Sequence, residues 1–266
     1  MRAPAPKPDV PRNEQALTLR SYAQGAVFAE QVGSAPPEAL FLHGWGRDRH
    51  DMLHLARGFD SLVPDLPGFG ASPPPEGVAG GAEYAAEMSQ VLEEAGVAAP
   101  VVVVAHSFGG RVAVCLASAR PDLVGALVLC GVPLLRLGAR KKPSLGYRAV
   151  RAGHRLGIVS DARLERWKQA RGSADYKSAS GVMRDILTKA VNETYEAELA
   201  GVLCPVAFVW GADDSAAPAA IVSDACGLVA GPVTVDIVDG AGHDIHRQHP
   251  ELLVLRAREL LEKIRS

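Results

Sequence analysis

The chain has 266 residues, of which 48% are hydrophobic and 22% are charged, and its formal net charge at pH 7 is −2. This length and composition predict one large folded domain, or one core domain that carries an insertion, and they exclude wholesale disorder. The small net charge gives no general attraction to nucleic acid, and the sequence has no apolar stretch of about 18 residues. We therefore expect neither a nucleic-acid partner nor a membrane span.

The N-terminal segment 1–15 is rich in proline and has no apolar run. We interpret it as a flexible tail and not as a secretory signal. The cysteines are far apart in sequence and form no CxxC pair, which indicates small buried side chains in a reducing compartment. The predicted localisation is therefore cytoplasmic.

Along most of the chain, short apolar runs alternate with longer segments of helical period. Apolar composition predicts strands at Ala26–Glu30, Ala39–His43, Ser61–Asp65, Val101–Ala105, Ala126–Cys130, Val206–Trp210 and Val233–Val238. Helical periodicity predicts helices near 48–58, 83–95, 108–119, 217–227 and 249–264. Strands that alternate with helices favour an α/β fold with a mostly parallel, doubly wound sheet.

Residues 134–200 depart from this alternation, because they contain three helical patterns (144–158, 161–171 and 180–195) and no strand. We predict that they form a helical cap inserted into a core made of 16–133 and 201–266. Such an insertion would lie over the carboxyl ends of the strands, where open α/β folds bind ligands. The predicted cap carries 14 Lys and Arg against 7 Asp and Glu, whereas the rest of the chain is net negative.

Residues 101–114 read VVVVAHSFGGRVAV, which is an apolar strand followed at once by a helical segment. Ser107 lies at the junction, with the small residues Ala105 and Gly109 two positions to either side. A sharp turn of this kind projects the serine hydroxyl above the sheet and directs the amides at the helix start toward a reacting oxygen. The pattern predicts a nucleophilic serine.

A serine hydroxyl needs a base to remove its proton, and that base needs a third group to orient it. His243 follows the last predicted strand in the sequence GAGHD, and it is our candidate base. The preceding strand runs into WGADDSAAP, so two adjacent carboxylates, Asp213 and Asp214, could orient the imidazole. The order along the chain is serine, aspartate and histidine.

An early strand ends in FLHGWG, and with the motifs above it resembles the α/β-hydrolase superfamily. The elbow of this family is usually G-x-S-x-G, and Ala105 here replaces the first glycine. The resemblance implies that Ser107 is the nucleophile and His243 the general base. The family spacing G-x-x-D-x-x-x-P selects Asp214 over Asp213 as the orienting acid.

The resemblance also implies an oxyanion hole formed by the backbone amides of Trp45 and Phe108. The segment DLPGFGAS at 65–72 matches a further loop of the family, which we interpret as structural. Trp167 and Met183 of the predicted cap could cover an apolar pocket or could simply hold the cap helices together. The residues that we place around a substrate are His43, Gly44, His106, Trp167 and Met183.

This resemblance implies a serine hydrolase that cleaves a carboxylic ester of a small molecule through an acyl-enzyme, without a cofactor. Two alternatives remain open: a C–C bond hydrolase of ring-cleavage dienoates, and a ligand-binding member of the fold without catalysis. Dehalogenases and epoxide hydrolases use an aspartate nucleophile. We set them aside because Ser107 occupies that position.

The predicted cap carries a basic helical face. Arg148, Arg151 and Arg155 share this face by their spacing, and the run Arg140-Lys141-Lys142 precedes it. The face could be a solvated surface, or it could attract an anionic substrate or an acidic carrier protein. The second hypothesis draws on a resemblance to carboxylesterases that share HGWG and release a methyl ester from an acyl group on such a carrier.

Two histidine patterns are candidate metal ligands. They are His243-x-x-His246-x-x-His249 and His50-x-x-x-His54, and we interpret both as solvated surface residues, the usual case for histidine pairs on a helix. We therefore expect no metal site. No G-x-G-x-x-G loop is present, so we expect no nucleotide cofactor.

Overall fold

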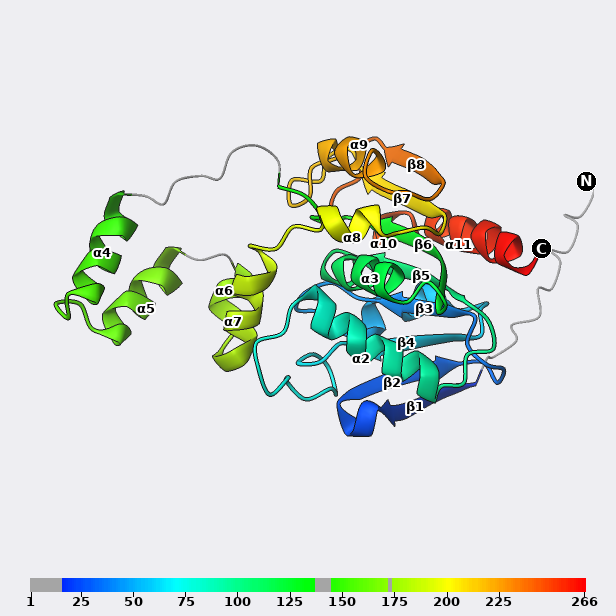
Figure 1. Cartoon of the computed structure of the whole chain (residues 1–266), viewed down its shortest axis with the longest axis horizontal. Coiled ribbons are helices and arrows are strands. Elements are labelled where there is room, and N and C mark those ends of the chain that lie inside the picture. The colour runs from blue at the N-terminus through cyan, green and yellow to red at the C-terminus, as the bar shows by residue number, and fades with distance from the viewer. Residues whose placement is uncertain (1–15, 137–144, 172–173) are drawn as a thin grey trace, which may run out of the picture.

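The computed structural model describes residues 16–136, 145–171 and 174–266. The tail predicted at 1–15 and the run Arg140-Lys141-Lys142 lie outside these residues. Within the described part of the chain, the strands form one sheet in the order β1-β2-β4-β3-β5-β6-β7-β8 (Figure 1). The strands are β1 (Leu17–Tyr22), β2 (Val27–Val32), β3 (Ala39–Leu42), β4 (Ser61–Asp65), β5 (Val101–His106), β6 (Val124–Cys130), β7 (Val206–Gly211) and β8 (Val233–Val238).

The sheet is antiparallel at one end and parallel elsewhere. The pairs β1–β2 and β2–β4 are antiparallel, and every pair from β4–β3 to β7–β8 is parallel. The predicted α/β fold with a mostly parallel sheet is thus confirmed. The sequence analysis missed β1, because five of the six residues of this edge strand are exposed and they form no apolar run.

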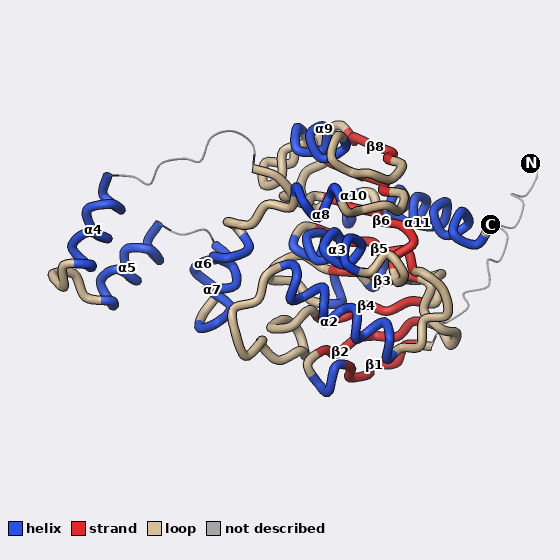
Figure 2. Tube along the Cα trace, viewed as in Figure 1, coloured by secondary structure: helices blue, strands red, loops and turns tan. Residues whose placement is uncertain are grey.

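Helices cover both faces of the sheet (Figure 2). The helix predicted near 48–58 is instead a short 3₁₀ turn, η2 (Arg49–Asp51), followed by the one-turn helix α1 (Leu53–Ala56). A second 3₁₀ turn, η1 (Ala23–Gly25), joins β1 to β2. The other helices are α2 (Gly81–Glu94), α3 (Phe108–Ala119), α4 (Leu145–Arg155), α5 (Asp161–Arg171), α6 (Ala174–Ser178), α7 (Gly181–Ala190), α8 (Glu196–Ala200), α9 (Ala220–Cys226), α10 (Ile245–Gln248) and α11 (Pro250–Arg265).

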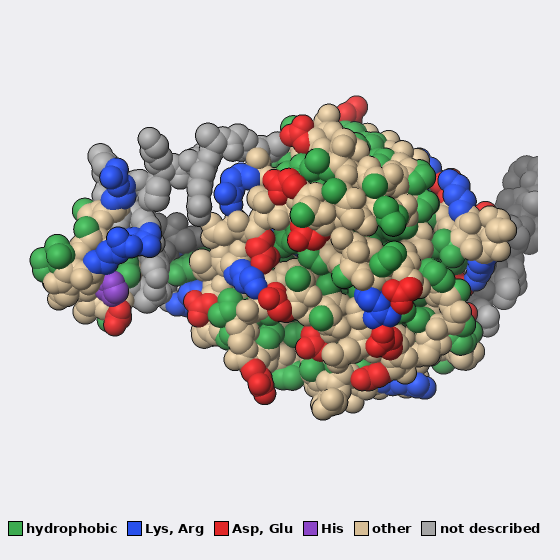
Figure 3. Space-filling model, in the orientation of Figure 1, with side chains coloured by type: hydrophobic (Ala, Val, Ile, Leu, Met, Phe, Trp, Pro, Cys, Tyr) green, Lys and Arg blue, Asp and Glu red, His purple; other side chains and the backbone are tan. Residues whose placement is uncertain are grey.

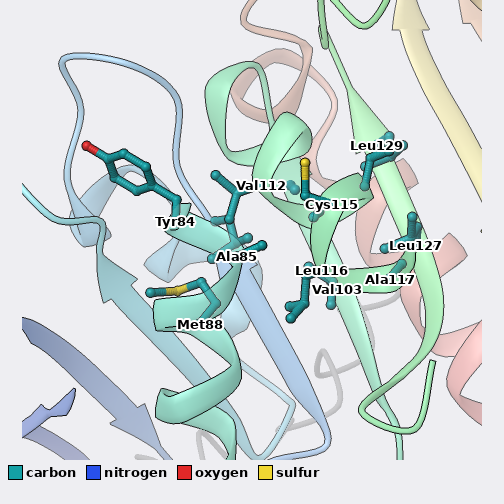
Figure 4. Packing of buried hydrophobic residues seen from close by; sticks show 14 of the residues in the cluster. Tyr84, Ala85, Met88, Val103, Val112, Cys115, Leu116, Ala117, Leu127 and Leu129 are labelled. Carbon is teal, nitrogen blue, oxygen red and sulfur yellow. The ribbon is translucent and has the colours of Figure 1, made fainter. Parts of the chain in front are cut away.

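The valine run of β5 is buried on both faces of the sheet. Val101 and Val103 belong to the apolar cluster under α2 and α3, whereas Val102 and Val104 belong to the cluster under α11. Figure 4 shows side chains of α2 and α3 packed against β5 and β6 in the first cluster. Burying a valine side chain contributes about 1.5–3 kcal/mol, so two-sided burial makes β5 a firm support for the turn that follows it.

The segment predicted as a cap divides into two parts. Helix α7 packs on the core, with Ile186 and Ala190 buried in the same cluster as α2 and α3. Helices α4 and α5 contact each other, and Figure 1 shows them apart from the sheet and from the helices that cover it. No helix in the described ranges combines the length and the apolar character needed to cross a bilayer.

Candidate active site

The turn between β5 and α3 holds Ser107 in a conformation that residues other than glycine rarely adopt, with φ 50° and ψ −114°. Neighbouring strands hold this turn in place. The Ser107 amide donates to the carbonyl of Cys130 at 3.0 Å, and the Gly109 amide donates to the carbonyl of His43 at 3.1 Å. A Cβ on Gly109 would lie 2.6 Å from that His43 oxygen, so only glycine allows α3 to begin so close to β3.

Three predicted side chains meet at the carboxyl edge of the sheet. His243 Nε2 lies 3.2 Å from Ser107 Oγ, and His243 Nδ1 lies 2.8 Å from Asp214 Oδ2. The Asp214 side chain is 1% exposed, and its other oxygen accepts the amides of Ala216 and Ala217 at 2.9 and 2.8 Å. These bonds hold the carboxylate in one orientation. Asp213 is exposed, and its amide donates to a backbone carbonyl.

The partner of each ring nitrogen determines what His243 can do. The Asp214 carboxylate only accepts hydrogen bonds, so the neutral imidazole carries its proton on Nδ1. Its Nε2 therefore offers a lone pair to the Ser107 hydroxyl. This arrangement can remove the serine proton, and the carboxylate can stabilise the imidazolium that results.

The loop after β3 passes directly beside the nucleophile. A Cβ on Gly44 would lie 3.3 Å from Ser107 Cβ and 2.8 Å from His106 Nδ1. The buried His43 side chain holds this loop by hydrogen bonds. Its Nδ1 lies 2.8 Å from the Gly44 carbonyl, and its Nε2 accepts the Leu66 amide at 3.0 Å. Burial lowers the pKa of His43, so the ring stays neutral and can make both bonds.

The predicted oxyanion residues lie at the start of α3 and in this loop. Phe108 is the first residue of α3, so its amide has no acceptor within the helix. The rings of Trp45 and Phe108 pack edge to face at 5.3 Å, and Phe69 packs 5.0 Å from Trp45. These rings form an apolar wall beside Ser107. The sequence analysis did not identify Phe69, because we read the loop that contains it as structural.

The two predicted cap residues lie in different places. Met183 of α7 reaches the loop that contains Phe69, since a Cβ on Gly68 would lie 2.2 Å from its sulfur. Trp167 of α5 lies against α4, where a Cβ on Gly146 would be 3.8 Å from its ring. The structure thus brings Met183, but not Trp167, to the wall beside Ser107.

His106 lies behind the nucleophile, among partners that the sequence analysis did not connect. Its Nε2 lies 3.1 Å from the His243 carbonyl, and its ring lies 4.0 Å from the ring of His246. His246 Nε2 in turn lies 3.0 Å from Asp51 Oδ2. Burial is the main reason that the pKa of His106 falls well below its ordinary value. His106 is 2% exposed, so the structure places it as an internal residue.

The histidines of the two candidate metal patterns do not converge. His243, His246 and His249 lie beside Asp214, Asp51 and Glu251 respectively. His50 pairs with the partly buried Asp48, and His54 Nε2 lies 3.0 Å from the carbonyl of His246. Within the described residues, a different set of candidate ligands is close together: Asp51, His106 and His246.

Cavity size does not identify the site. A cavity of about 670 Å³ lies between η1, the loop at 73–79 and α2, and neither Ser107 nor His243 lines it. A smaller cavity of about 230 Å³ borders the turn that holds Asp214, and Arg111 and Arg136 line it. The candidate active site is therefore assigned from the geometry of Ser107, His243 and Asp214.

Comparison with known proteins gives partial sequence matches and full-length structural ones. Lipase LipV of Mycobacterium tuberculosis (strain ATCC 25618 / H37Rv) is 41% identical over 110 residues, 40% of this chain and 41% of LipV. Esterase Rv0045c of the same strain is 39% identical over 111 residues, 41% of this chain and 37% of the esterase. These matches span about two fifths of each relative.

The crystal structure of a membrane phospholipase A, described as a novel bacterial virulence factor, superposes with a TM-score of 0.71. It is 21% identical in sequence, and the match covers 95% of this chain and 87% of that one, so the likeness concerns the fold. A sequence model of the Alpha/beta hydrolase family matches residues 39–257. That range includes Ser107, Asp214 and His243, together with most of the sheet, and the chain belongs to the alpha/beta hydrolase family.

Proposed function

We propose that the protein hydrolyses carboxylic esters through an acyl-enzyme intermediate. Ser107 Oγ attacks the ester carbonyl while His243 Nε2 takes the hydroxyl proton, and the amides of Trp45 and Phe108 stabilise the negative oxygen of the tetrahedral intermediate. The intermediate collapses to an acyl-serine when His243 returns the proton to the leaving alcohol. A water molecule, deprotonated by the same histidine, then attacks the acyl-serine and releases the acid.

One observation carries this proposal. Ser107, His243 and Asp214 form a continuous hydrogen-bonded row at the carboxyl edge of the sheet, with separations of 3.2 and 2.8 Å. The names of the relatives, a lipase and an esterase, support an ester as the substrate.

The test is a panel of p-nitrophenyl esters that differ in acyl length, assayed with the wild type and with Ser107→Ala. We expect turnover of at least one ester, and a loss of about a thousandfold or more in kcat for the variant, because no other group can form the acyl-enzyme. A vinylogous dienoate in the same panel tests the alternative of C–C bond cleavage. If wild type and variant hydrolyse every ester equally slowly, the proposal is wrong.

We further propose that residues 134–200 act as a cap that selects anionic esters or an ester on an acidic carrier protein. Arg148, Arg151 and Arg155 of α4 are exposed, and Figure 3 shows Lys and Arg side chains on this outlying part of the surface. Exposed charges of one sign raise the local concentration of oppositely charged ligands.

A further inference from the structure

The segment that carries His243 also carries His246, which forms a second histidine–aspartate pair with Asp51. His243 Nδ1 lies 2.8 Å from Asp214, and three residues later His246 Nε2 lies 3.0 Å from Asp51. The first pair activates Ser107 in the proposed function. The second pair is almost enclosed, with side-chain exposures of 0% for His246 and 7% for Asp51, and the proposed reaction does not use it.

The Asp51 carboxylate joins two loops. It lies 3.7 Å from Arg47 and 3.8 Å from Arg247, and Arg47 also donates to both oxygens of Asp244 at 3.1 and 3.2 Å. Burial alone would raise the pKa of Asp51, but the hydrogen bond and charge of His246, together with Arg47, lower it to about 2. A permanent charge thus links the segment that follows the oxyanion loop to the segment that follows His243.

His106 also contacts the segment that carries His243, and it does so with a neutral ring. Its Nε2 donates to the carbonyl of His243 at 3.1 Å, and its ring lies 4.0 Å from His246 and 4.8 Å from His243. His106 Nδ1 is buried without a hydrogen-bond partner among the described residues. A proton on that nitrogen would be left unsatisfied, so the ring holds its one proton on Nε2.

The same residues are also candidate metal ligands, with ligand atoms within 4.8 Å of one another. Their geometry favours hydrogen bonding. His246 Nε2 lies 3.0 Å from Asp51 Oδ2, and His106 Nε2 lies 3.1 Å from the His243 carbonyl, so one nitrogen of each ring already has a hydrogen-bond partner. The Nδ1 atoms of both rings are buried without a hydrogen-bond partner among the described residues, so zinc binding is a direct test of the metal alternative.

We propose that Asp51 and His246 are positioning residues for the ester hydrolysis proposed above. Through the hydrogen bond between Asp51 and His246, they hold His243 at a fixed place relative to the oxyanion amide of Trp45. This inference rests on the proposed function. If the base is displaced by about 1 Å from its position beside the nucleophile, kcat falls strongly even when the substrate still binds.

The test compares variants that keep or remove one hydrogen bond. Asp51→Asn keeps an oxygen that can accept from His246 Nε2, whereas Asp51→Ala removes it. We expect kcat to fall roughly tenfold to a hundredfold in Asp51→Ala with KM within about twofold, and to recover to within about fivefold of the wild type in Asp51→Asn. His50→Ala is the matched control, because His50 makes the same kind of bond to Asp48 at an exposed position.

A second pair of variants keeps the test decisive if Asp51→Ala unfolds beside its two arginines. His246→Gln keeps a donor toward Asp51, and His246→Leu removes it, so Gln should retain more kcat than Leu at temperatures where both are folded. Equal kcat within each pair would overturn the proposal. Zn²⁺ binding to the wild type by calorimetry, lost in His246→Gln, would also overturn it in favour of a metal site.

The failure of the proposed function would look different. If the wild type hydrolyses no ester, the rate at which a fluorophosphonate modifies Ser107 still reports the position of His243, since that reaction needs only the nucleophile and its base. The labelling rates of the Asp51 and His246 variants then test the positioning role alone, and Asp51→Asn and His246→Gln should be labelled faster than Asp51→Ala and His246→Leu.

Discussion

The carboxyl edge of the sheet and the α4–α5 helices differ in how their residues are held. At the edge, Ser107, His243 and Asp214 come from three separate segments, and each is fixed by hydrogen bonds or burial. On α4, Arg148, Arg151 and Arg155 are exposed and stand apart from the sheet. Chemistry needs groups fixed within a fraction of an ångström, whereas attraction between charges works over about 10 Å. Edge residues should therefore control the turnover of every ester, and α4 residues only the choice among esters.

The largest effect is expected at the acid that orients His243. Asp214→Asn keeps the shape of the side chain, but its amide can donate to His243 Nδ1, which places the imidazole proton on Nε2. Nε2 then cannot accept the serine proton, so we expect kcat to fall by about a thousandfold to ten-thousandfold. Asp213→Asn is the matched control, because Asp213 is adjacent and exposed. Steady-state kinetics on one ester measures both, and a larger loss in the control would break the comparison.

A smaller and more selective effect is expected on α4. Replacing Arg148, Arg151 and Arg155 by glutamate should lower kcat/KM for an anionic ester by about threefold to tenfold at low salt, because the attraction becomes repulsion. A neutral ester of the same acyl length is the internal control and should be unaffected. Unchanged kinetics on both esters, with unchanged salt dependence, would remove the role proposed for this face.

The smallest effect concerns the pH dependence of stability at the edge. Burial lowers the pKa of His106 from its ordinary 6.5. In acid the imidazole at this position therefore binds a proton more readily in the unfolded chain than in the folded chain. This difference lowers the free energy of unfolding as the pH falls below about 6.5, by up to about 1.4 kcal/mol per pH unit for one group. Denaturant titrations should show a shallower decline in His106→Asn, and parallel curves for wild type and variant would contradict this account.

Apolar runs in the sequence predicted seven of the eight strands in the described part of the chain. Ser107, Asp214 and His243 each follow such a run, and the family resemblance was needed to choose Asp214 over Asp213. The sequence could not indicate that Asp51 pairs with His246, since these residues are 195 positions apart and nothing in the two histidine patterns connects them. It also could not place α4 and α5. Periodicity predicts that a segment is helical, but it does not show what the apolar face of that helix packs against.

The edge strand β1 illustrates a further limit. Leu17 and Leu19 are 47% and 44% exposed, so the burial that usually produces an apolar signal is missing. Pairing with β2 through the backbone makes the strand, and backbone pairing leaves little trace in the side chains.

The most direct test of the central claim is the rate and site of modification by a fluorophosphonate in the folded protein. Peptide mass spectrometry should locate the adduct on Ser107 in the wild type, and labelling should slow by about a thousandfold in His243→Ala, because the hydroxyl then has no base. An adduct at another residue, or equal labelling rates for the wild type and His243→Ala, would contradict the account.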